Sequence, residues 1–170
     1  MDRPESTKRV LGAMRFFNTA KNYQFAADEL VAISDADQEK RSALRDPTYY
    51  LYFHAFESGL KAFLLLNGIS LGGARHTLMD HYQKFVDAGM DRERRALTVV
   101  SALQDANKDH ALRYFTVHST WAPELGWTKQ VAHELMQSIE SAIKAIDPQA
   151  FDPGPAFKVI ATIGPITPDR

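Results

Sequence analysis

Four polar side chains repeat at helical spacing in the otherwise apolar stretch from Asp46 to Gly68. They are His54, Glu57, Ser58 and Lys61. Positions i, i+3, i+4 and i+7 share one face of a helix, so these residues form a single polar stripe. Histidine exchanges protons near neutral pH, and a glutamate four residues before a lysine forms a favourable helical ion pair. We interpret the polar stripe as a structural polar network, with a catalytic or ligand-binding site as the alternative.

The helix that carries the polar stripe is expected to lie at the centre of the fold. Asp46 and Pro47 are typical of a helix start, and Asn67-Gly68 is typical of a helix end. Apolar residues cover most of the circumference between these ends, which is typical of a helix buried among others. Charges in such a setting must be paired. We expect the partner to be Arg113 or His110 on the fourth helix.

Apolar periodicity predicts helices along most of the chain. We expect a first helix from Ser6-Thr7 to about residue 33 and others at 76–88, 91–114 and 128–146. Residues 35–45 are expected to form a polar connector or a frayed short helix, and 116–126 an irregular segment. Short loops between long helices favour antiparallel neighbours. The prediction is an all-α, antiparallel up-and-down bundle of about five helices over residues 1–148. A Pro-rich tail, 149–170, contains a short β-like run at 157–163; it docks on the bundle, docks on a partner, or moves freely.

Composition excludes several functional classes. The chain has 170 residues, no cysteine and a formal net charge of −1. Thiol catalysis, thiolate metal sites and disulfides are therefore excluded, and no whole-molecule attraction to nucleic acid is expected. No Glu-x-x-His pair or glycine-rich phosphate loop occurs, so we expect neither metal nor cofactor. The charged N-terminus and the charges inside the central helix argue against secretion and membrane insertion, and we expect a cytoplasmic protein.

Several short motifs resemble the HEPN family. The segments are His54-Ala55-Phe56-Glu57, Leu60-Lys61-Ala62, Gly68, His76-Thr77-Leu78 and Arg113-Tyr114. The resemblance covers about residues 13–146, and it departs from the family pattern at Thr77, where the family usually has Asp. It implies a helical bundle, usually dimeric, of the kind found in prokaryotic toxin–antitoxin and defence systems.

The resemblance leaves two functions open. Catalytic HEPN proteins are metal-independent ribonucleases that use Arg-x(4–6)-His across a dimer, and Arg113 and His118 match that spacing. Arg75 and His81 match it too, so spacing alone is weak support. Tyr114 after Arg113 resembles branches without the nuclease pattern. We therefore expect a non-catalytic, homodimeric binding module for a partner protein, nucleic acid or small ligand. The alternative is an endoribonuclease using Arg113 and His118.

Overall fold

Helices make up the described part of the chain. A computed structural model describes residues 5–72, 77–90, 93–107 and 123–148, and within these ranges it contains helices and no strand. They are α1 (Glu5–Ala36), α2 (Gln38–Leu66), α3 (Leu78–Asp87), α4 (Arg94–Ala106) and α6 (Leu125–Ile146). The predicted all-α bundle is confirmed, whereas the tail from 149 lies outside the described residues.

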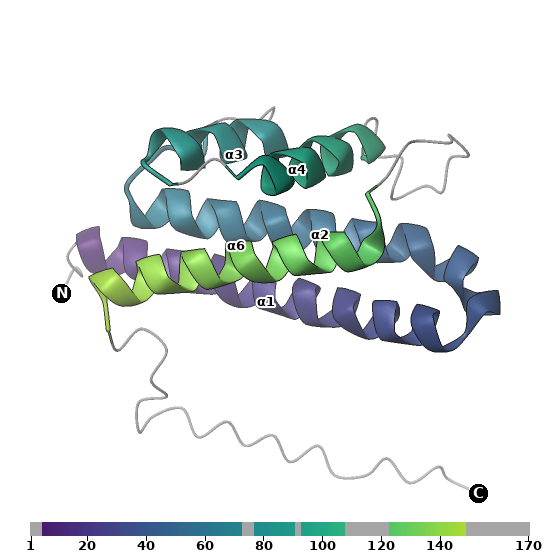
Figure 1. Cartoon of the computed structure of the whole chain (residues 1–170). Helices are drawn as coiled ribbons and strands as arrows, with labels where there is room; N and C mark the ends of the chain where they lie inside the picture. The colour runs from purple at the N-terminus through teal and green to yellow at the C-terminus, as the bar shows by residue number, and fades with distance from the viewer. Residues whose placement is uncertain (1–4, 73–76, 91–92, 108–122, 149–170) are drawn as a thin grey trace, which may run out of the picture.

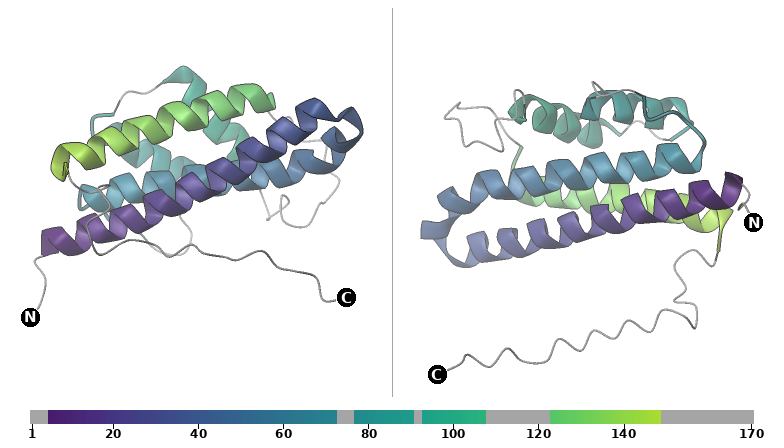
Figure 2. Two further views of the ribbon diagram at one scale, coloured as in Figure 1. Left: turned by 90° about the horizontal axis from the view of Figure 1, so that it is seen from below. Right: turned by 180° about the vertical axis from the view of Figure 1, so that it is seen from behind.

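Two long helices form the frame of the bundle. α1 and α2 run antiparallel side by side over most of their length (Figure 1). α6 packs against both of them, and the shorter helices α3 and α4 cover a different side of α2 (Figure 2). α2 therefore contacts every other described helix, as expected for a central helix that is apolar on most of its circumference.

The predicted start of the central helix was wrong. α2 begins at Gln38, nine residues before Pro47, and Asp37 caps it by accepting from the backbone N–H groups of Glu39 and Lys40 at 3.0 and 3.4 Å. The segment before Pro47 is rich in strong helix formers, Gln, Glu, Lys, Arg, Ala and Leu, so it continues the helix. Proline removes only one donor from the helical ladder, and α2 tolerates this loss because its packing stabilises the remaining turns.

Other helix ends follow local signals. Asn67 caps the end of α2, and Gly68 takes a φ of 69°, which glycine adopts without steric cost. Thr77 begins α3 with a reciprocal capping box to Asp80. α6 begins at Leu125 rather than 128, because the Glu124 carboxylate accepts from the N–H groups of its first turn. In the described residues no helix is long and apolar enough to cross a membrane.

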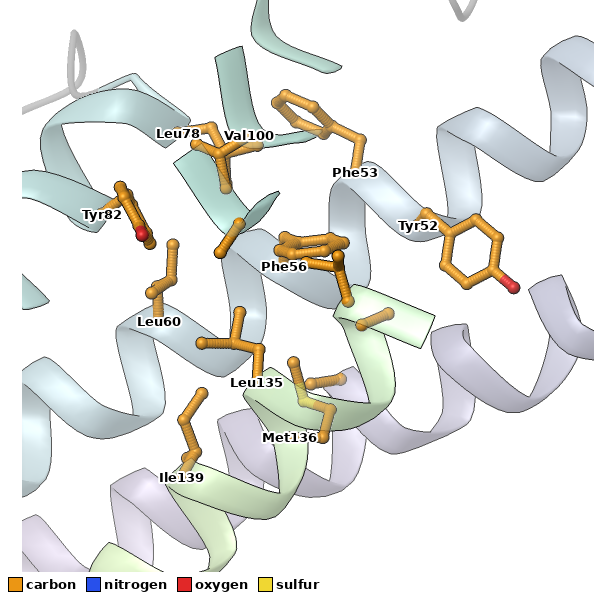
Figure 3. Close-up of a cluster of buried hydrophobic side chains, with 14 of the residues drawn as sticks. Tyr52, Phe53, Phe56, Leu60, Leu78, Tyr82, Val100, Leu135, Met136 and Ile139 are labelled. Carbon is orange, nitrogen blue, oxygen red and sulfur yellow. The ribbon is translucent and has the colours of Figure 1, made fainter. Parts of the chain in front are cut away.

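Every described helix contributes to the core, and Figure 3 shows its part between α2, α6 and the α3–α4 pair. Phe56 and Leu60 of α2 point into it, between residues of α6 below and residues of α3 and α4 above. All of the labelled core residues except Phe53 and Leu135 are at most 2% exposed, so the interior is closely packed. This core holds α2 rigidly, and α2 in turn positions the polar stripe.

Gly59 marks the closest approach of α2 to α6. A Cβ atom added there would lie 2.4 Å from the Met136 Cε atom and 3.2 Å from the Ile139 Cδ1 atom. Met136 is 1% exposed, so its methyl group has little room to move. We expect Gly59→Val to lower the free energy of unfolding by about 1–2 kcal/mol through overpacking. Urea denaturation measures this, and an unchanged midpoint would show that α6 shifts freely.

Candidate functional site

The polar stripe lies on the side of α2 that faces away from α6. Gly59, on the opposite side of the helix, contacts α6, whereas His54 of the stripe lies beside Tyr23 of α1. The right panel of Figure 2 views the bundle from behind, with α6 on the far side of α1 and α2. The side chains of His54, Glu57 and Lys61 are 14%, 25% and 26% exposed. The stripe is therefore half-buried, neither fully solvated nor sealed inside the core.

Glu57 holds the three functional groups of the stripe together. One carboxylate oxygen accepts from Lys61 Nζ at 2.8 Å, and the other lies 3.2 Å from His54 Nδ1. An ionised carboxylate only accepts hydrogen bonds, so the proton of this second contact must reside on Nδ1. The ion pair expected between Glu57 and Lys61 is therefore present, and a histidine completes it.

The carboxyl group of Glu57 is strongly acidic. Its pKa is lowered to about 2, chiefly by the hydrogen bond from His54 and then by the contact with Lys61, while burial acts in the opposite direction. Glu57 is consequently ionised throughout the physiological range. A carboxylate with such a low pKa is a poor general base near neutral pH, which favours a structural or recognition role.

Aromatic rings surround the imidazole of His54. The ring centroids of Tyr50, Tyr23 and Phe53 lie 4.4, 5.3 and 5.4 Å from the centroid of His54. Tyr23 belongs to α1, so this shell also joins the two long helices. The second imidazole nitrogen, Nε2, is buried and has no hydrogen-bond partner among the residues that the structure describes. One polar atom of the site is thus left for a partner outside those residues.

The remaining predicted site residues cannot be placed. His110, Arg113, Tyr114 and His118 all lie in 108–122, outside the described residues. The suggested pairing of the stripe with Arg113 or His110 therefore stays a prediction. Arg75 is also outside the described ranges, whereas His81 is buried in α3. The structure thus brings together His54, Glu57 and Lys61, which share one helix.

A second polar cluster joins three helices, and the sequence did not predict it. Asp28 of α1 accepts at 2.7 Å from the hydroxyl of Tyr52 on α2, and its other oxygen lies 2.7 Å from Nε2 of His133 on α6. Tyr52 is fully buried, and its hydroxyl points toward α1 (Figure 3). Burial first, and then the carboxylate, raise the pKa of this phenol. Asp28 therefore ties α1 to both neighbours.

The Asp28 cluster is better suited to structure than to catalysis. An Asp–His pair orients a general base in many hydrolases, but that chemistry needs a nucleophile that faces the base. Here the tyrosine hydroxyl donates to the carboxylate instead, and Tyr52 has no exposed surface. No single-sequence signal links these residues, because Asp28 and His133 are 105 positions apart.

No metal site is evident among the described residues. Within them no three His, Asp or Glu side chains come close enough to hold an ion. The described fold and site therefore define a class: an all-α bundle with a half-buried, internally bonded polar stripe on its central helix. Comparisons of the chain with protein-family models, with curated proteins and with solved structures found no match.

Proposed function

We propose that this chain is a HEPN-like, non-catalytic helical module that forms a homodimer and binds a partner through the polar stripe. The family resemblance implies a prokaryotic stress or defence system as its setting, and we propose a cytoplasmic location. The observation that carries the proposal is the His54–Glu57–Lys61 network, which is half-buried within an aromatic shell on the central helix.

The chemistry of the stripe favours recognition over catalysis. Lys61 and His54 both bond to Glu57, so the positive and negative charges of the site offset each other in the resting state. A hydrogen-bonded network held by packing is rigid, and rigid polar groups beside tyrosines are typical of the centre of an interface. Tyrosine is also common among residues that dominate binding energy. The partner is a protein, a nucleic acid or a small ligand.

Exposed apolar side chains on α1 support the homodimer. Leu11, Phe25 and Ile33 are 36%, 67% and 42% exposed. Their spacing of 14 and 8 residues places them on the same broad side of the helix. Single exposed apolar residues are common, whereas three along one helix provide a surface that a second copy can cover. We therefore assign the dimer contact to this side of α1.

The dimer is tested by mass and by a matched pair of charge substitutions. Light scattering at micromolar concentration should report twice the 19.1 kDa of one chain. Phe25→Glu should weaken the dimer by roughly 10–100-fold, because it places a charge in the apolar contact. Asn22→Glu, on a residue that is already polar and exposed one turn away, is the control and should change the dimer little. A 19 kDa species at every concentration would contradict the proposal.

The ribonuclease alternative has its own test. We expect no RNA cleavage by the full chain at any pH between about 5 and 9, the range in which histidine acid–base catalysis operates. Chelator should be present throughout, because the alternative needs no metal. Cleavage that resists chelator, leaves a 2′,3′-cyclic phosphate and disappears in His118→Ala would establish the alternative and refute the non-catalytic module.

A further inference from the structure

A groove runs along α6 on a different side of the bundle from the polar stripe. An inner cavity of about 100 Å³ lies where α6 meets α3 and α4, and it borders a wider surface groove of about 570 Å³. Both are lined by Met90, Glu93, Glu134 and Ser138. The wider groove continues along α6 to Ser141 and Ala142, close to the end of the helix at Ile146.

The groove has an apolar floor and an acidic edge. Tyr82, Phe85, Val131 and Leu135 line the inner part. Glu134 is bonded to Arg95 of α4 at 3.0 and 3.1 Å, so its charge is offset. Glu93 is exposed and has no ion pair within the described part of the chain. The occupant that fits is a short segment with alternating apolar side chains and one positive charge.

The chain itself contains such a segment just after α6. Residues 157–163 read Phe-Lys-Val-Ile-Ala-Thr-Ile. In an extended strand Phe157, Val159 and Ile163 would share one face, and the β-branched residues favour that conformation. Lys158 supplies the positive charge. No other basic residue occurs in the tail before Arg170.

The chain after α6 is long enough for this segment to reach the groove. Roughly ten residues separate the end of α6 from Phe157, and an extended chain of that length spans up to about 33 Å. The groove follows α6 from Val131 to Ala142, about 17 Å of helix. Ile146, one turn beyond Ala142, is 55% exposed and extends the apolar path toward the start of the tail.

We propose that residues 157–163 of the same chain bind in the groove between α6 and the α3–α4 pair, with Lys158 beside Glu93. A tethered segment gains a high effective concentration, so modest apolar contacts are sufficient to hold it. The C-terminal segment then acts as an internal ligand that covers the groove along α6. This inference is independent of the proposed dimer, which uses α1.

Disulfide cross-linking in the full chain tests the proposal. Because the chain has no cysteine, an engineered pair supplies its only thiols. Ser138→Cys with Val159→Cys joins the groove to the segment. Asn18→Cys with Val159→Cys is the control, since Asn18 is exposed on α1 and does not line the groove. We expect the intramolecular disulfide to form at least about tenfold faster in the groove pair, because docking raises the local thiol concentration.

One further substitution and one mixing experiment test the proposal more closely. Adding Lys158→Glu to the groove pair should slow cross-linking toward the control rate, because it places a second negative charge beside Glu93. Equal rates in the two pairs would overturn the proposal. Disulfides that form mainly between chains, detected by mixing Ser138→Cys with Val159→Cys proteins, would also overturn it and assign the groove to a second copy. Neither result depends on the dimer mass, so this proposal and the proposed function fail separately.

Discussion

Asp28→Ala is expected to lower the free energy of unfolding by about 2–4 kcal/mol, the largest effect predicted for a single substitution in this chain. Alanine leaves the hydroxyl of Tyr52, a residue with no exposed surface, without its acceptor. It also removes the contact between α1 and His133 of α6. Both α2 and α6 therefore lose their side-chain contact with Asp28 of α1. Urea denaturation followed by circular dichroism measures the change.

A double-mutant cycle separates the two contacts of Asp28. Tyr52→Phe removes the hydroxyl but keeps the ring, and we expect a loss of about 1 kcal/mol because the carboxylate keeps its histidine. His133→Ala should cost less, about 0.5 kcal/mol, because the imidazole is 45% exposed. The effect of either substitution should largely vanish in the Asp28→Ala background. Additive effects would show that the three side chains do not form one network.

Glu57→Ala has the second large expected effect, a loss of about 1–3 kcal/mol in the free energy of unfolding. The substitution leaves Lys61 and His54 half-buried without the carboxylate that both contact. Glu140→Ala is the matched control, because Glu140 and Lys144 form the same i, i+4 pair on an exposed part of α6. The control should change stability by less than about 0.5 kcal/mol. Equal losses at the two sites would contradict a special role for the stripe.

The lowered pKa of Glu57 predicts how the stability of the fold changes in acid. The pKa of Glu57 is lowered from 4.5 to about 2, so folding favours the ionised form. Its contribution is complete above about pH 4.5 and is lost as the pH falls toward 2. The stability difference between the native chain and Glu57→Gln should therefore shrink over this interval. A difference that stays constant from pH 6 to pH 2 would show that Glu57 titrates normally.

Local patterns predicted the helices well where residues close together in the sequence decide the structure. Apolar periodicity predicted the helical segments, and Asn67-Gly68 and Gly89 marked the ends of α2 and α3 correctly. The helical repeat also placed His54, Glu57 and Lys61 on one face, where they bond to one another. Each of these features depends on residues within about two turns, so the order of residue types was sufficient.

Local patterns failed where the signals compete. Proline and aspartate at 46–47 are typical of a helix start, yet α2 begins at Gln38 because the preceding residues are strong helix formers. The start of α6 was also misplaced, because Glu124, rather than a residue nearer 128, caps it. Both errors concern which of two nearby start signals is used. Helix propensity decides the first choice, and a side-chain cap decides the second.

By itself the sequence determined that the described part of this protein is an all-α bundle, that its central helix is apolar on most sides, and that one polar stripe interrupts this apolar surface. Only the tertiary structure decided what those helices bring together. The Asp28–Tyr52–His133 cluster joins residues 24 and 105 positions apart, and the groove beside α6 needs three helices. Such contacts depend on how helices cross and which side chains interdigitate. Helical periodicity carries no information about either, because it describes one helix at a time.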